Sequence, residues 1–259
     1  MNKKEFQEFF EKNRGQFISG IYNYCDRWCE RCSLKSKCSL YAREEQRDKS
    51  NDNNPEAFFE QVSENFKIVM EMLLEMAEEK GIDLNTIEDI EFEQEEKNLK
   101  EFADNHILSV QSKEYSNLLI KWFDENETTL KKQIEIINQS IELGLSNQDT
   151  LKDFESLKDA IEIIHWYSFQ IHVKLMRALR HGELDLEYED PIQNDINGSA
   201  KVALIGTERS LGAWGILHSQ LPEQEDEIIT ILLLLEKIRK GIFKTFPKVN
   251  EFVRPGFDE

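Results

Sequence analysis

The sequence lacks the features that mark several large classes of protein. No apolar run reaches the roughly 18 to 20 residues that a membrane-spanning helix needs, and the most apolar run, residues 228–235, is far shorter. No convincing stretch of alternating apolar and polar residues indicates a β-strand. We therefore expect a chain without a membrane-spanning helix and without a β-sheet.

Positive charge is also scarce. The chain has 32 Lys and Arg residues against 51 Asp and Glu, for a net charge of −19. Because an acidic surface repels phosphate, this composition argues against nucleic acid as a partner. The one basic island comprises Arg27, Arg31, Lys35, Lys37, Arg43 and Arg47. These charges offset a negatively charged site in our main interpretation, and a docking surface for an acidic protein partner is the alternative.

Sequence motifs of the common enzymes are missing. The phosphate-cradling pattern Gly-x-x-x-x-Gly-Lys is absent. Neither a nucleophile elbow nor a catalytic Ser, His and Asp order is present. Whether the chain is an enzyme is therefore uncertain from its sequence.

Cysteine is confined to one short stretch, spaced C-x3-C-x2-C-x5-C. Its four members are Cys25, Cys29, Cys32 and Cys38. Residues 1–6 lead into an amphipathic pattern with no apolar signal-peptide region, so we expect a cytoplasmic protein, in which disulfides are rare. Such tight grouping favours thiolate ligation of a single metal centre.

The kind of metal depends on the backbone that carries the thiols. On a helix, Cys25, Cys29 and Cys32 would fall within about 60° of one another, and the chain would bend to return Cys38. Helical Cα atoms seven residues apart are about 10.5 Å apart, whereas the sulfurs around zinc are only about 3.8 Å apart. The sulfurs around a cubane cluster are roughly 6 Å apart. A helical backbone therefore favours an iron–sulfur (4Fe-4S) cluster, with zinc as the alternative.

The spacing Cys29-x2-Cys32-x5-Cys38, with a cysteine upstream, resembles the iron–sulfur staple of RecB-type nucleases. The resemblance is confined to residues 25–38, and the strand-borne carboxylate–lysine core of those nucleases is not found in the chain. It supports cluster chemistry and does not extend to nuclease activity. The triplet Cys25-x3-Cys29-x2-Cys32 also matches the radical-SAM pattern, but a fourth cysteine and a helical chain argue against that family.

Helical periodicity runs through the whole chain and predicts an all-α fold. We expect an antiparallel bundle of about five long helices with an N-terminal four-cysteine module, divided into residues 1–50 and 51–259. The expected helices are residues 3–24, 55–80, 99–143, 149–180, 197–218 and 222–246. The expected linkers and loops are residues 44–54, 82–98 and 183–196. Small residues in the segment 197–215 indicate close approach of neighbouring helices.

Two helices are expected to contribute most to the core. In residues 55–80 the predicted core face comprises Phe58, Phe59, Val62, Phe66, Val69, Met70, Leu73 and Met76. The segment 149–180 is apolar on nearly every side and is expected to be the most buried helix.

The segment 149–180 also carries polar residues that could form a second site. Glu162-x-x-His165 has the spacing of di-iron carboxylate bundles, although the second motif that such a site needs is missing. Glu162, His165 and His172 are the candidate catalytic residues, with a mononuclear metal site as one use. The alternative is that the histidines are buried and satisfied by hydrogen bonds. In either case we expect a polar cluster inside the bundle.

The sequence as a whole predicts a cytoplasmic, metal-binding helical protein that is not an enzyme and either binds a protein partner or senses redox state. The alternative is a metalloenzyme with a carboxylate and histidine site inside the bundle.

Overall fold

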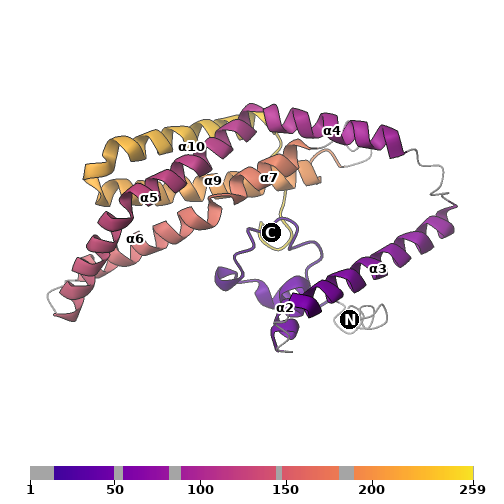
Figure 1. Ribbon diagram of the computed structural model, residues 1–259, viewed down its shortest axis with the longest axis horizontal. Helices are drawn as coiled ribbons and strands as arrows, with labels where there is room; N and C mark the ends of the chain where they lie inside the picture. Colours follow the sequence, from indigo (N-terminus) through magenta and orange to yellow (C-terminus); the bar gives the residue numbers. More distant parts are fainter. Residues whose placement is uncertain (1–14, 50–54, 82–88, 144–147, 181–189, 259) are drawn as a thin grey trace. The chain divides into compact units, whose positions relative to one another are not determined.

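The structure is a computed structural model, and it describes residues 15–49, 55–81, 89–143, 148–180 and 190–258. In these residues the regular structure is helical and contains no β-strand, so the all-α prediction is confirmed (Figure 1). None of the described helices combines the length and hydrophobicity needed to cross a membrane.

The chain divides into two compact units. The first unit is Met1–Glu96 together with Arg254–Glu259, and the second unit is Lys97–Val253. Helix α4 (Asp89–Asn105) contains the point of division. The domain boundary predicted between residues 50 and 51 therefore lies inside the first unit.

The first unit contains two short 3-10 turns followed by helices. These elements are η1 (Cys29–Arg31), η2 (Lys35–Lys37), α2 (Ser39–Lys49) and α3 (Pro55–Lys80). Helix α3 has the predicted bounds, since it begins at Pro55 and is followed by Gly81 at φ +66°, a backbone conformation that favours glycine.

Other parts of the first unit differ from the prediction. Residues 15–24, expected to be helical, form turns, and residues 3–14 of the same predicted segment lie outside the described residues. Residues 44–49, expected to be a linker, are the second half of α2. Likewise, residues 89–98 are continuously helical in α4, where a loop with broken helix was expected.

The described part of the second unit contains the rest of α4 and five further helices. They are α5 (Ile107–Glu142), α6 (Gln148–Tyr167), α7 (Gln170–Leu179), α9 (Asp195–Gln220) and α10 (Glu225–Thr245), with the 3-10 turn η4 (Pro222–Gln224) before α10. Two of the predicted helices are each divided into two helices in the structure. Residues 99–143 are interrupted at His106, whose Nδ1 accepts a hydrogen bond from Leu108 N at 3.2 Å. Residues 149–180 are interrupted at Ser168, whose Oγ donates to His165 O at 2.8 Å.

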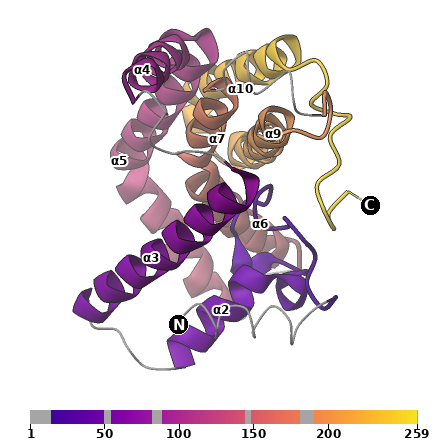
Figure 2. The same ribbon diagram turned by 90° about the vertical axis from the view of Figure 1, so that its right-hand side faces the viewer.

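Helix α9 is the centre of the second unit. It packs against α6, α7 and α10, and Figure 2 shows it beside α7 and α10. Half of its residues are buried, whereas Phe169 and Val173 in the segment 149–180 are 57% and 59% exposed. The prediction that 149–180 is the most buried helix is therefore wrong, although Ile164 and Ile171 are buried as expected.

The small residues of α9 explain why it occupies the centre. A Cβ added to Gly206 would lie 2.8 Å from Tyr167 Cδ1 and 3.2 Å from Ile171 Cγ1. Glycine at this position therefore allows α6 and α7 to approach the backbone of α9 closely. This is the close helix approach that the composition of residues 197–215 predicts.

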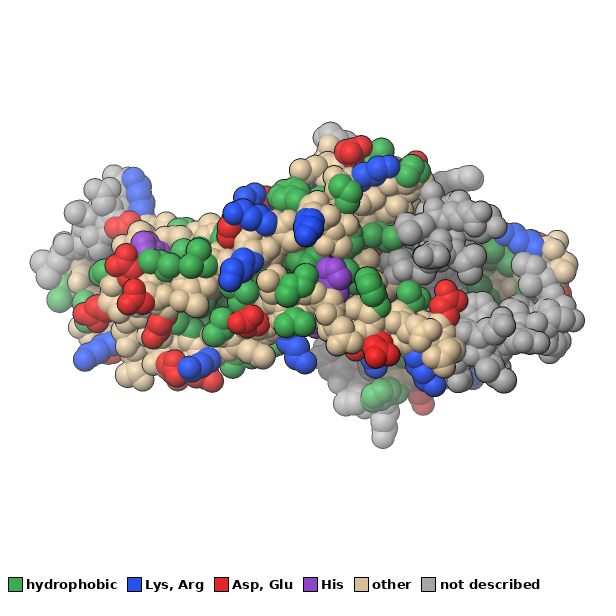
Figure 3. Space-filling model, turned by 90° about the horizontal axis from the view of Figure 1, so that it is seen from above, with side chains coloured by type: hydrophobic (Ala, Val, Ile, Leu, Met, Phe, Trp, Pro, Cys, Tyr) green, Lys and Arg blue, Asp and Glu red, His purple; other side chains and the backbone are tan. Residues whose placement is uncertain are grey.

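The predicted core face of α3 is largely on the surface. Phe59 is 69% exposed, Phe66 is 75% exposed and Leu73 is 52% exposed. The side chain of Phe58, part of the same predicted face, lies outside the described side chains. On the face drawn in Figure 3, exposed hydrophobic side chains lie among charges of both signs.

Candidate metal centre

The cysteine segment is built of tight turns. Asp26 Oδ1 accepts a hydrogen bond from Trp28 N at 3.2 Å, and Arg27 between them has a positive φ of 60°. An aspartate side chain that binds the backbone competes with helical hydrogen bonds, and a left-handed residue ends any helix. Cys25 and Cys29 therefore do not share a helical face. The expected three-thiol helical face is wrong, and the distance argument that favoured a cluster over zinc no longer applies.

Two of the cysteines close 3-10 turns in the same way. Cys32 N donates to Cys29 O at 3.2 Å after η1, and Cys38 N donates to Lys35 O at 3.2 Å after η2. Both closing cysteines have extended backbones. Cys38 also precedes α2, and its carbonyl accepts a bond from Ala42 N at 3.1 Å. Cys38 therefore lies at the amino end of α2.

The electrostatics of Cys29 indicate that the thiols influence one another. Burial raises the pKa of Cys29, and Glu44 on α2 raises it further. Cys25, Cys38 and Cys32 each add to the rise in this pKa. Deprotonating the group is therefore unfavourable in the absence of a cation, because negative charges would accumulate. A bound metal cation reverses this balance.

The four cysteines supply thiols of the kind that bind a metal, but their positions do not form a metal site. All four are partly buried and none forms a disulfide. However, no group of three or more His, Cys, Asp or Glu side chains in the described part of the chain is placed to hold a metal ion. Metal binding at Cys25, Cys29, Cys32 and Cys38 thus stays a prediction.

The basic island around the cysteines forms contacts with aromatic rings. The Arg31 guanidinium lies 4.0 Å from the centre of the Trp28 ring, and the Lys35 ammonium lies 5.7 Å from the centre of the Tyr41 ring. Cation–π contacts of this kind hold a positive charge against the protein surface. These charges remain close to the cysteine segment, where they would offset thiolates.

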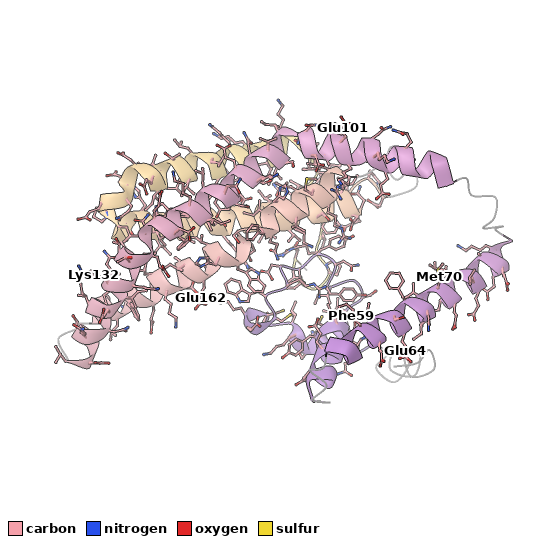
Figure 4. The ribbon with its side chains drawn as sticks, in the orientation of Figure 1. Phe59, Glu64, Met70, Glu101, Lys132 and Glu162 are labelled. Atoms are coloured by element: carbon pink, nitrogen blue, oxygen red, sulfur yellow. The ribbon has the colours of Figure 1, made fainter. Side chains whose placement is uncertain are left out.

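The second candidate site, on α6 and α7, is not a buried cluster. Glu162, labelled in Figure 4, is exposed, and His165 is exposed with its ring 4.2 Å from that of Phe123. His172 is partly buried and contacts Ser112 Oγ through Nδ1 at 2.9 Å. The expectation of a polar cluster inside the bundle is therefore wrong for Glu162 and His165. A catalytic role for these three residues stays a prediction.

The hydrogen bonds of His172 assign its tautomer. Ser112 Oγ donates its only hydrogen to Ser109 O at 3.0 Å, so it accepts from the His172 Nδ1–H. The other ring nitrogen, Nε2, is then an acceptor in the neutral ring. Burial lowers the pKa of His172, and the charge of Lys113 lowers it further. His172 lines a surface groove of about 760 Å³ with Asp104 and Lys113.

Some functional features could not be read from the spacing of residues. Glu44 lies six residues after the last cysteine in a segment expected to be a linker, and only its position on α2 brings it near Cys29. Burial raises the pKa of Tyr115 to about 12, and its hydroxyl accepts a bond from Trp214 Nε1 at 3.3 Å.

No protein-family model, curated protein or solved structure matches the chain.

Proposed function

We propose that the four cysteines bind one metal centre that holds the cysteine segment in shape, in a protein that acts by binding a partner and not by catalysis. One observation carries the proposal. Between residues 15 and 38, Ile21 is the single buried residue. So little buried apolar surface cannot offset the entropy lost when a segment of turns becomes ordered. Metal binding supplies folding free energy to segments of this kind.

Backbone contacts of this segment are consistent with such a role. Ile18 N donates to Lys37 O at 3.0 Å and so joins the two ends of the segment. The chain's last residues return to it, because a Cβ added at Gly256 would lie 2.7 Å from Ile18 Cδ1. Gly256 has φ +75°, so this close approach needs glycine for two reasons. A metal would add a strong crosslink to these scattered contacts.

The proposal covers both thiolate-bound centres, an iron–sulfur cluster and zinc. The turns at Cys29 and Cys38 remove the geometric reason for preferring the cluster. A reducing, cytoplasmic environment belongs to the proposal because the thiols must escape oxidation to bind either centre.

We also propose that Lys97–Val253 is an antiparallel bundle of about five helices, to which the cysteine module is attached in sequence. Support comes from the packing of α9 against α6, α7 and α10, and of α5 against α10 and α7. An exposed Glu162 and an exposed His165 give little support to a reaction centre inside this bundle.

Metal analysis of protein purified without oxygen tests the proposed centre. We expect about one zinc per chain, or about four irons with a broad absorbance near 400 nm. Single Cys→Ser variants at Cys25, Cys29, Cys32 and Cys38 should each lose most of the metal. Ser33→Ala in the same segment is the matched control and should keep it. Fully folded protein with neither metal would refute the proposal.

A further inference from the structure

The cysteine segment carries exposed positive charge in an otherwise acidic chain. Residues 24–43 contain five Lys and Arg against two Asp and Glu, whereas the whole chain has a net charge of −19. Arg27, Lys35 and Lys37 are exposed, and within the described residues none of the three forms an ion pair with a carboxylate. These three charges are therefore accessible to a ligand and are not neutralised by a neighbouring acid.

Arg27 occupies a backbone position that is unfavourable for its side chain. In the described part of the chain it is the one residue other than glycine with a positive φ, at 60°. A left-handed backbone brings Cβ too close to a carbonyl oxygen, and so it favours glycine or asparagine. The Arg27 side chain makes no hydrogen bond or ring contact with the described residues that would offset this cost. Strained residues of this kind cluster at ligand-binding positions, which indicates that the guanidinium serves a ligand.

The chemistry of the segment favours an acidic peptide over nucleic acid. Proteins bind single strands through phosphate contacts and through bases that stack on aromatic rings. The rings of Trp28 and Tyr41 are half-buried, and each already has a cation near it, Arg31 at 4.0 Å and Lys35 at 5.7 Å from the ring centre. A long polyanion would also be repelled by the acidic remainder of the chain, whereas a short acidic peptide needs only the basic segment.

We propose that the exposed cations of residues 24–43 bind an acidic segment of a partner protein, with Arg27 pairing with one of its carboxylates. A guanidinium donates two parallel hydrogen bonds to a carboxylate, and the ammonium groups of Lys35 and Lys37 attract further carboxylates. This inference rests on the part of the proposed function that assigns partner binding. Offsetting thiolate charge is the other role open to these cations, and it is separable because it would alter the retention of metal.

A fluorescein-labelled octaglutamate peptide, added to full chain purified without oxygen, is the probe. Fluorescence anisotropy at about 50 mM salt should give a Kd of about 10–100 μM, and about 300 mM salt should weaken binding at least about fivefold. An octaglutamine peptide of the same length should not bind. A single-stranded DNA of about 20 nucleotides should bind more weakly than octaglutamate.

Four substitutions separate the role of Arg27 from net charge and from folding. Arg27→Asn should weaken octaglutamate binding about fivefold or more, because the fork of donors is lost. The same variant should keep its metal and a melting temperature at or above that of the wild type, because asparagine tolerates a positive φ. Lys35→Gln combined with Lys37→Gln should weaken binding by a similar factor and also keep the metal. Lys132→Gln removes an exposed charge from the second unit and should leave binding within about twofold of the wild type.

Four results would overturn the proposal. Octaglutamate could fail to bind at low salt, or the Arg27 and Lys132 variants could weaken binding equally. Loss of metal from Arg27→Asn and from the double lysine variant would show that these cations serve the thiolates instead. Tighter binding of the DNA than of octaglutamate, lost in Arg27→Asn, would assign the surface to nucleic acid. Peptide binding by a chain without metal would refute the metal proposal alone, and a metal-loaded chain that binds no peptide would refute this one alone.

Discussion

At the scale of single residues, side chains that bind the backbone determine where helices stop and which groups face the candidate sites. Asp26 turns the chain ahead of Cys29, and His106 separates α4 from α5. The sequence contains both residues, but whether an Asp or His side chain binds its own backbone depends on competition with helical hydrogen bonds. The cysteine spacing predicted a shared site and could not predict the turns that carry it.

His172 should make the stability of the second unit depend on pH. The pKa of His172 in the folded chain is lowered from its ordinary value of 6.5, mainly by burial. The neutral ring is therefore favoured by folding, its stabilising contribution is complete above about pH 6.5, and it is lost as pH falls through the folded pKa. Urea unfolding between about pH 5 and 7.5 should show the free energy of unfolding falling on the acid side.

The variant His172→Gln isolates this contribution. The Gln amide can still donate to Ser112 Oγ, but it does not titrate. The fall in stability on the acid side should therefore be shallower in the variant than in the wild type. It should not vanish, because burial also lowers the pKa of His106 and of His165. An unchanged slope would show that His172 keeps its ordinary pKa in the folded chain.

At the scale of helices, the periodicity of the sequence predicted where helices begin and end better than it predicted which elements they pack against. Pro55 and Gly81 determine the bounds of α3, and α10 begins with an acidic first turn as expected. The burial of α3 was predicted wrongly because an apolar stripe looks the same whether it faces its own core or another molecule. The central place of α9 was missed because Gly, Ser and Ala carry little apolar signal, although they permit close packing.

Two glycines of α9 should respond to alanine in opposite directions. Gly206→Ala would place a Cβ 2.8 Å from the Tyr167 ring, so the unit must shift, and we expect a loss of about 1–3 kcal/mol in the free energy of unfolding. Gly212→Ala meets nothing within 4 Å, so it should gain about 0.5–1 kcal/mol from helix propensity. Chemical unfolding measures both. Equal effects at the two positions would contradict the central packing of α9.

At the scale of the whole molecule, the sequence predicts an all-helical chain and one thiol-rich site, and both follow from patterns local in sequence. The division into two units does not follow from local patterns. Helix α4 continues without a break across the boundary between the units, and the last residues of the chain belong to the first unit. Such long-range connections depend on contacts that no local spacing records. For the same reason the sequence indicates four metal ligands without showing how close the thiols lie.

The two units should respond differently to removal of metal. The second unit has its own buried core around α9, whereas residues 15–38 bury only Ile21. If a metal supplies the missing folding free energy, a chelator should release the cysteine segment and leave the second unit folded. Limited trypsin digestion reads this out at Arg27 and Arg31, which are both exposed.

We expect metal-loaded protein to resist cleavage at these two sites, because a protease needs a locally unfolded backbone even where the side chain is exposed. Chelated protein should be cut there at least about tenfold faster, and residues 97–253 should persist as a stable fragment with an unchanged melting transition. A Cys29→Ser chain should be cut quickly with or without chelator, which separates loss of metal from other effects of the chelator. Equal cleavage rates before and after chelation would show that contacts such as that of Ile18 with Lys37 hold the segment without a metal.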